Sequence, residues 1–122
     1  MSNTLHLTLE KKWFDLIELF EKNKEYREFK PYWCCRLLLY DGKKRSQKWW
    51  EQSIKKNSIM ADLVVVVQFD VLIMKNGYGK DDPTLRVDCL GLSYGYRLFF
   101  KGATPCKERV FCFELGKRER II

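Results

Sequence analysis

Hydrophobic and polar residues alternate at the start of the chain and then change to a helical period. Residues 4–9 alternate leucines with threonines and a histidine, which is typical of a strand with one buried face. Over residues 10–21 the apolar positions recur every three or four residues, so we expect an amphipathic helix there. We expect its apolar stripe to face the core, and the stripe consists of Trp13, Leu16, Ile17 and Phe20.

Short elements are predicted through the middle of the chain. A strand at 24–30 is followed by Pro31, which suits the first turn of a helix at 32–39. The dipeptide Asp41-Gly42 predicts a turn after that helix. Residues 43–57 form a further predicted helix with a narrow apolar stripe.

The second half of the chain is dominated by predicted strands. Residues 62–74 are rich in valine and isoleucine and predict one long strand, buried on both faces at its start. A loop at 76–79 would present Tyr78 at its tip. Strands are expected at 84–94 and 110–115. We expect residues 95–105 to be a long loop or a short irregular strand, and the glycine and KRER at 116–120 to end the ordered chain.

This order of elements predicts one α+β domain over residues 1–122. The sheet should be strongly curved and mostly antiparallel, with two or three flanking helices. A small barrel would remove the exposed strand edges. With 122 residues, of which 46% are hydrophobic and 15% aromatic, the chain can build one compact core.

Composition argues against several classes of protein. No apolar run approaches the roughly 20 residues of a membrane span, and the N-terminus does not resemble a secretory signal, so we expect a cytoplasmic protein without membrane contact. The five cysteines form no C-x-x-C pair, and the chain has one histidine, His6. We therefore expect neither a metal nor a cofactor, and we interpret Cys34, Cys89 and Cys112 as small buried hydrophobic residues.

The net charge of +7 is concentrated in one segment. Residues 1–42 carry seven basic and seven acidic residues, residues 43–60 six and one, and residues 61–122 ten and eight, which gives 0, +5 and +2. Basic side chains attract phosphates, and tryptophans offer surfaces on which bases stack. We predict nucleic-acid contacts by Lys43, Lys44, Arg45, Lys48 and Trp49, and the alternative is a solvated basic helix. A smaller basic cluster comprises Lys117, Arg118 and Arg120.

The stretch EKNKEYREFKPYW, residues 21–33, combines charges of both signs with aromatic rings. As a strand it would place Glu25, Arg27 and Phe29 on one face. Burying Glu25 beside Arg27 is costly unless the charges satisfy each other or a ligand, which favours a site. The alternative is a solvated edge strand whose charges prevent edge-to-edge pairing.

Four stretches together resemble an ASCH domain of the small stand-alone type found in bacteriophages and bacteria. They are LTLEKKWFDLI, EKNKEYREFKPYW, FDVLIMKNGYGKDDPTLRVDCLGLSYG and VFCFELGK. The family motif G-x-K-x-x-E-x-R is matched by Lys22, Glu25 and Arg27, while Phe20 stands where the family usually has glycine. The basic segment at about 43–60 would be an insertion.

The resemblance implies a PUA-like β-barrel with a cleft for RNA or a nucleotide-like ligand. Lys22, Glu25 and Arg27 would line this cleft, and Asn76 and Tyr78 would lie near its mouth. Lysine and arginine can meet phosphates or base acceptors, a carboxylate can accept from an exocyclic amine, and a tyrosine can stack. An RNA- or nucleotide-binding module is therefore the first functional hypothesis.

Two alternatives come from other classes of protein. Some ASCH proteins are amidohydrolases of acylated cytidines, and Lys22 matches their lysine, although Glu25 stands where they have threonine and their later glutamate has no match here. Lys22 and Glu25 would then be the catalytic proton carriers, acting on a modified nucleoside or RNA. The second alternative is a protein-interaction domain whose partner surface contains Trp49, Trp50, Phe99 and Phe100.

Overall fold

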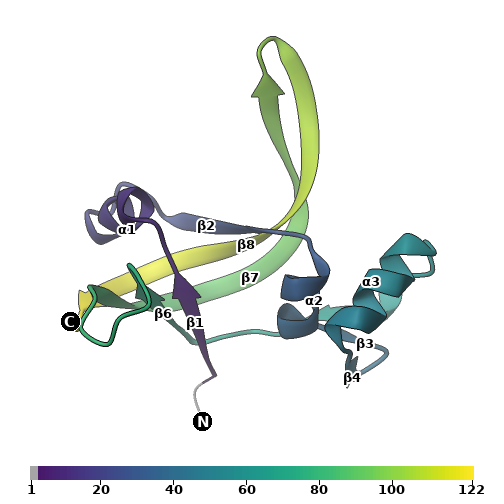
Figure 1. Cartoon of the computed structure of the whole chain (residues 1–122), viewed down its shortest axis with the longest axis horizontal. Coiled ribbons are helices and arrows are strands. Elements are labelled where there is room, and N and C mark those ends of the chain that lie inside the picture. The colour runs from purple at the N-terminus through teal and green to yellow at the C-terminus, as the bar shows by residue number, and fades with distance from the viewer. Residues whose placement is uncertain (1–2) are drawn as a thin grey trace. The chain divides into compact units, whose positions relative to one another are not determined.

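The computed structural model describes residues 3–122 and has an α+β architecture, as predicted (Figure 1). The chain divides into two compact units. Unit 1 contains the described residues up to Glu25 together with Gln68–Leu92 and Phe113–Ile122, and unit 2 contains Tyr26–Val67 and Ser93–Cys112. The prediction of one domain is not tested by this division.

Unit 1 is built on a parallel pair of strands, β1 (Thr4–Thr8) and β6 (Val71–Lys75), paired from Thr4↔Val71 to Thr8↔Lys75. The antiparallel partner of β6 is the start of β7 (Thr84–Lys101). The helix α1 (Lys11–Glu18) follows β1. The buried side chains of this unit include Leu7, Phe14, Ile17, Leu72, Met74, Leu85, Val87, Phe113 and Leu115.

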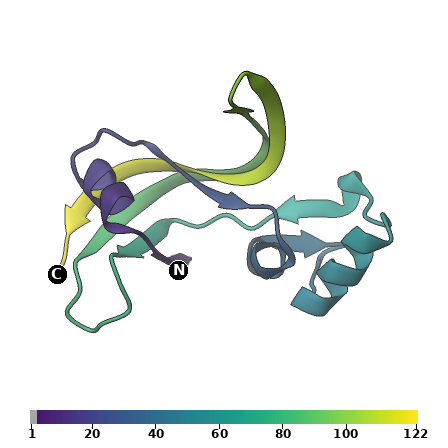
Figure 2. The same ribbon diagram turned by 45° about the horizontal axis from the view of Figure 1, so that its top comes forward.

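Unit 2 contains a small antiparallel sheet with the order β4-β3-β5. The helices α2 and α3 pack against each other in this unit (Figure 2). Its buried side chains include Cys34, Leu37, Leu38, Trp50 and Phe111. The elements are α2 (Pro31–Leu37), β3 (Leu38–Tyr40), β4 (Lys43–Lys44), α3 (Gln47–Lys55), a short 3-10 helix (Ala61–Leu63) and β5 (Val64–Val66).

A five-stranded sheet has the order β1-β6-β7-β8-β2, where β8 is Thr104–Arg120 and β2 is Lys24–Glu28. It is mixed, since β1 and β6 run parallel while β6 and β7 run antiparallel. Among residues 3–122 three α-helices accompany the sheets, and no closed barrel is found among the strands of this part of the chain, so the barrel stays a prediction.

The predicted helix at 32–39 is too long. It ends at Leu37, and Leu38 and Leu39 belong to β3, where they pair with Val66 and Val65 of β5. The basic segment also begins as a strand, and α3 starts only after Ser46, whose Oγ accepts the Trp49 N–H at 3.0 Å. This hydrogen bond is an N-cap, which favours a helix start at that residue.

The predicted long strand at 62–74 is wrong, because β5 and β6 belong to different sheets. The break occurs at two polar side chains. Gln68 donates from Nε2 to the Leu92 carbonyl at 3.0 Å and accepts the Leu92 N–H at 3.1 Å, and the Asp70 carboxylate accepts the Asn3 N–H at 2.8 Å. The prediction also placed the residues buried on both faces at the start of 62–74. In the structure such residues are found in β6, and β5 is only partly buried.

The predictions for residues 95–105 and 116–120 are also wrong. Strand β7 continues to Lys101, Gly102 turns the chain with φ of 62°, and β8 begins at Thr104 and continues to Arg120. The residues around this turn lack a buried face, since Leu98 and Phe100 are exposed. Backbone pairing between β7 and β8 therefore determines the structure around the turn. This pairing cannot be recognised from a pattern of hydrophobic residues.

Candidate functional site

The turn between α1 and β2 positions the predicted charged residues. The Phe20 N–H donates to the Ile17 carbonyl at 3.1 Å and the Glu21 N–H to the Leu16 carbonyl at 2.9 Å, the pattern of a Schellman cap. Phe20 occupies the left-handed position of this cap, with φ of 60°. A side chain there costs roughly 1–2 kcal/mol, which explains why glycine is preferred at such positions.

The predicted stripe of α1 is only partly core. Trp13 and Phe20 are exposed, while Phe14 and Ile17 are buried. The two exposed rings instead lie near cations. The Lys22 Nζ is 4.8 Å from the centroid of the Trp13 ring, and the Arg118 Cζ is 4.2 Å from that of Phe20. The helix therefore presents aromatic rings to the basic side chains that follow it.

Lys22 and Glu25 form an ion pair that is largely removed from water. The Lys22 Nζ lies 2.7 Å from the Glu25 Oε1, and the side chains are 19% and 5% exposed. At this distance and burial the two groups hold each other in fixed positions, because separating them would leave charges in a poorly solvated place. The structure thus brings together two of the three motif residues.

The other predicted ligand-binding residues have their own surroundings. Arg27 lies in unit 2, where its Nη1 donates to the Tyr26 carbonyl at 3.0 Å and its Cζ is 5.5 Å from the Trp33 ring centroid. The backbone N–H of Asn76 donates to the Pro83 carbonyl at 2.9 Å, and Tyr78 is 93% exposed at the loop tip, as predicted. A common cleft for these residues stays a prediction.

Tyr78 borders a pocket of about 340 Å³ in unit 1. The strand residues His6, Leu7 and Thr8 contribute to its wall together with Lys75 and Thr84. The Lys75 Nζ donates to the Gly79 carbonyl at 3.0 Å and so holds the loop that carries Tyr78.

The basic segment forms a cationic and aromatic surface in unit 2. Lys43 and Lys44 on β4 and Lys48 on α3 are exposed. Arg45 differs, because its guanidinium donates to the Tyr40 carbonyl at 3.2 Å and its Cζ lies 5.0 Å from the Trp49 ring centroid. We call Lys43, Lys44, Lys48 and Trp49 the basic surface.

Trp50 cannot contribute to a partner surface as predicted, since its side chain is fully buried. It lies edge-on to the rings of Trp49 and Tyr40, with centroid distances of 5.1 and 6.0 Å. Trp50 is therefore a core residue that supports the half-buried ring of Trp49.

Two of the three residues in the predicted C-terminal basic cluster, Arg118 and Arg120, form hydrogen bonds within the protein. The Arg118 Nη1 donates to the carbonyls of Ile17 and Lys22 at 2.8 and 2.9 Å, and burial lowers the pKa of its guanidinium. Arg120 donates to both carboxylate oxygens of Glu18 at 2.8 and 2.9 Å. Lys117 and Arg120 are exposed, and Arg120 is the one of these two that is paired with a carboxylate.

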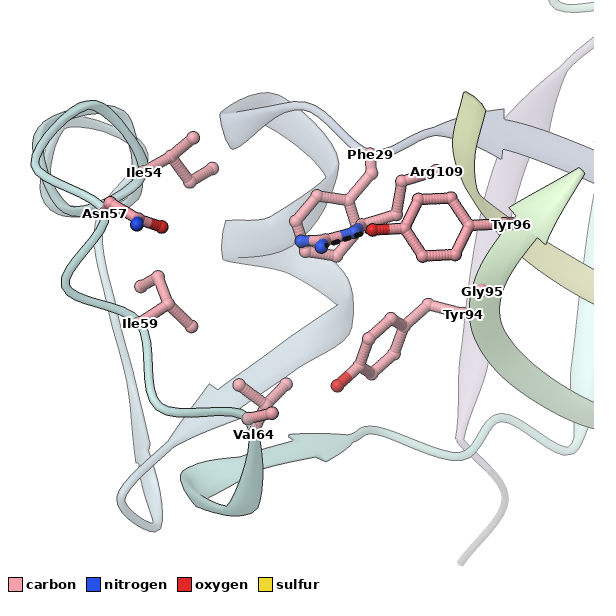
Figure 3. Close-up of a pocket in the computed structure, with 10 residues that line it drawn as sticks. Phe29, Ile54, Asn57, Ile59, Val64, Tyr94, Gly95, Tyr96 and Arg109 are labelled. Carbon is pink, nitrogen blue, oxygen red and sulfur yellow. Dashed lines mark hydrogen bonds between the residues drawn. The ribbon is translucent and has the colours of Figure 1, made fainter. Parts of the chain in front are cut away.

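A pocket in unit 2 was missed by the sequence analysis. Its volume is about 230 Å³, and it lies between α3 with its following loop on one side and the β7–β8 strands on the other (Figure 3). The lining residues are Phe29, Ile54, Asn57, Ile59, Ala61, Val64, Tyr94, Gly95, Tyr96 and Arg109. We call it the aromatic pocket.

An arginine and three aromatic rings form one wall of the aromatic pocket. The Arg109 Nη2 donates to the Tyr96 Oη at 3.0 Å, and the Arg109 Cζ lies 5.0 Å from the Phe29 ring centroid. This hydrogen bond from a cation lowers the pKa of Tyr96. The alternation of Tyr94 and Tyr96 was the available signal, but the predicted strand ended at Tyr94, and Tyr96 fell in the segment interpreted as a loop or short irregular strand.

The cysteines are free thiols, and Cys34 is fully buried, in agreement with its interpretation as a small hydrophobic residue. Cys89 and Cys112 are only partly buried. Within residues 3–122 no group of three or more metal-ligating side chains occurs. Of the helices in this part of the chain, none has the length and hydropathy needed to cross a bilayer.

No protein-family model matches this chain, and comparisons with curated proteins and with solved structures likewise find no match. The resemblance to ASCH domains therefore stays a prediction that depends on Lys22, Glu25 and Arg27.

Proposed function

We propose that this protein is an RNA- or nucleotide-binding module that contacts single-stranded RNA with its basic surface. The observation that carries the proposal is that three exposed lysines, Lys43, Lys44 and Lys48, belong to the same short segment of unit 2 as the half-buried ring of Trp49. Lysines in this position gain binding free energy by releasing counterions from phosphates. A half-buried indole that Trp50 and Arg45 hold in place offers a face for a base at little entropic cost.

The resemblance to ASCH domains supports the same function from another part of the chain. On this proposal Lys22, Glu25, Arg27, Asn76 and Tyr78 form a ligand cleft within a PUA-like barrel. A closed barrel and a cytoplasmic location belong to the proposal as well. The ion pair between Lys22 and Glu25 supports the motif, since it fixes a donor and an acceptor close together.

A binding titration tests the proposal. Fluorescently labelled single-stranded RNA of about ten nucleotides is titrated with the protein, and anisotropy reports the dissociation constant. We expect the triple variant Lys43→Glu, Lys44→Glu, Lys48→Glu to bind at least about tenfold more weakly, because three favourable phosphate contacts become repulsive. Arg45 is left unchanged, since its hydrogen bond to the Tyr40 carbonyl gives it a structural role.

A matched control separates local contact from overall charge. Lys12, Lys80 and Lys117 are also exposed but lie in unit 1, and their replacement by glutamate changes the net charge equally. The control variant should retain most of the affinity. Equal weakening by both triple variants would show that the basic surface is not the binding site.

The ion pair favours a second candidate function, hydrolysis of an acylated nucleoside. A lysine 2.7 Å from a carboxylate, with both side chains shielded from water, is arranged for proton transfer to or from a substrate. Release of free acid from an acylcytidine tests this function. Activity that disappears in Lys22→Met and in Glu25→Gln would support it, and a folded wild-type protein that releases no acid would contradict it.

A further inference from the structure

The aromatic pocket combines a ring that is packed against other rings with two polar groups that point into it. The Tyr94 ring is supported by Phe29 and Phe111, at centroid distances of 5.6 and 6.3 Å. Within residues 3–122, the Tyr94 hydroxyl and the Asn57 side-chain amide form no hydrogen bond with another residue. Figure 3 shows these two side chains pointing into the pocket from opposite sides.

The opposite wall is aliphatic. Ile54 lies on α3, Ile59 in the loop that follows it and Val64 at the start of β5, and they face the rings of the β7 strand (Figure 3). A flat group can therefore lie with one face on an aromatic ring and the other on branched aliphatic side chains. The side-chain amide of Asn57 would meet the edge of such a group rather than its faces.

The size and chemistry of the pocket select one class of occupant. Its volume of about 230 Å³ is below the roughly 300–1,000 Å³ typical of pockets for drug-sized ligands, so it suits a single ring system. An acyl chain would leave the Asn57 side-chain amide without a hydrogen-bonding partner. A nucleobase has the required shape, two stackable faces and an edge of donors and acceptors.

We propose that the aromatic pocket binds one unpaired nucleobase, which stacks on Tyr94 and forms hydrogen bonds with the Asn57 amide. Arg109 is fixed beside the pocket by Tyr96 and contacts the phosphate attached to that base. The inference deepens the proposed function, on which it rests for the RNA chain that supplies the base. Since the basic surface and the pocket share α3, one strand of RNA can contact both.

Asn57 can be replaced so that its side-chain amide is removed while the end of α3 is preserved. Its backbone φ is 53°, and its N–H donates to the Ile54 carbonyl at 3.0 Å, so it completes the C-terminal cap of α3. Glycine adopts this conformation without strain. Asn57→Gly therefore removes the amide and preserves the cap, and any loss of binding reports on the amide itself.

The test uses nucleosides, which contain no phosphate and so do not depend on the basic surface. The full chain is titrated with adenosine, guanosine, cytidine and uridine while backbone amide shifts are followed by NMR. We expect saturable shifts at Asn57, Tyr94 and Gly95 for at least one nucleoside. Asn57→Gly should weaken that binding about three- to tenfold, which corresponds to the net free energy of one amide hydrogen bond.

Variants of Tyr94 separate the ring from its hydroxyl. Tyr94→Ala should weaken binding roughly 5- to 150-fold through lost stacking, whereas Tyr94→Phe should retain most of the affinity. Phe100→Ala is the control, because Phe100 is an exposed aromatic residue of the same strand outside the pocket. It should bind nucleosides as the wild type does.

The results also separate this inference from the proposed function. If no nucleoside shifts the pocket residues, or if Asn57→Gly and Tyr94→Ala leave binding unchanged, the pocket is not a base site, even where RNA still binds the basic surface. If nucleosides bind in the pocket but single-stranded RNA does not bind, the inference holds as a nucleoside site and the RNA-binding function is wrong.

Discussion

Arg118 should be one of the main stabilising residues of unit 1, although the sequence places it in a basic tail. Its Nη1 holds the carbonyls of Ile17 and Lys22 at 2.8 and 2.9 Å, and its Cζ lies 4.2 Å from the Phe20 ring centroid. Arg118→Ala removes all three interactions at once. The carbonyls of Ile17 in α1 and of Lys22 in the turn after it then lose this charged donor.

The expected loss follows from these contacts. Hydrogen bonds from a charged donor contribute about 1.5–3 kcal/mol each, so two at the lower end give about 3 kcal/mol. The contact with Phe20 adds about 0.5–1 kcal/mol, and hydration of the released carbonyls offsets part of the sum. We expect Arg118→Ala to lower the free energy of unfolding by about 3 kcal/mol. Arg118→Lys should recover about half, since an ammonium lacks the planar fork.

Urea unfolding followed by far-UV circular dichroism measures this change, and an unchanged m-value shows that it is a change in stability. Arg120→Ala is the matched control, because Arg120 lies on the same strand and forms a partly exposed pair with Glu18. Such pairs contribute about 0–1 kcal/mol. If Arg118→Ala costs no more than Arg120→Ala, the capping role assigned to Arg118 is wrong.

Three further predictions concern stability. Phe20 has a left-handed backbone conformation, which glycine adopts with less strain than alanine. Phe20→Gly should therefore be more stable than Phe20→Ala by about 1 kcal/mol in the same urea assay. Equal stabilities would show that the backbone at this position is not strained. Trp50→Ala should lower the free energy of unfolding by about 3–5 kcal/mol and Trp49→Ala by clearly less, because Trp50 is the fully buried one of the two. The reverse order would show that Trp50 is not the core residue. Burial raises the pKa of the Cys34 thiol from 9.0 to about 12, so the folded state retains a proton that the unfolded state loses. The stability that this thiol contributes is complete below pH 9 and decreases as the pH rises towards 12, by up to about 1.4 kcal/mol per pH unit, and a Cys34→Ala variant with the same alkaline slope as the wild type would refute this.

The elements that the sequence predicts well are those whose burial follows one simple period. The alternation in residues 4–9 matches β1, and Pro31 stands at the first position of α2 as expected. Lys22 and Glu25 match a family motif that was expected to line one cleft, and the structure places these two side chains in contact. These features depend on residues that are close along the chain.

The features that were not predicted depend on partners far along the chain. The break between β5 and β6 occurs because Gln68 pairs with the backbone of Leu92, 24 residues later. The β7–β8 hairpin forms by backbone pairing, which leaves no pattern in exposed residues. Likewise the aromatic pocket joins Phe29, Asn57 and Tyr94 from three separate segments, so no local motif indicates it.

The most direct test of the central claim is the salt dependence of single-stranded RNA binding. For single strands the logarithm of the binding constant falls with the logarithm of salt concentration with a slope of about −0.7 per phosphate contact. Replacing Lys43, Lys44 and Lys48 by glutamine should therefore reduce the magnitude of the slope by about 2. An unchanged slope, or wild-type binding that does not respond to salt, would contradict the account.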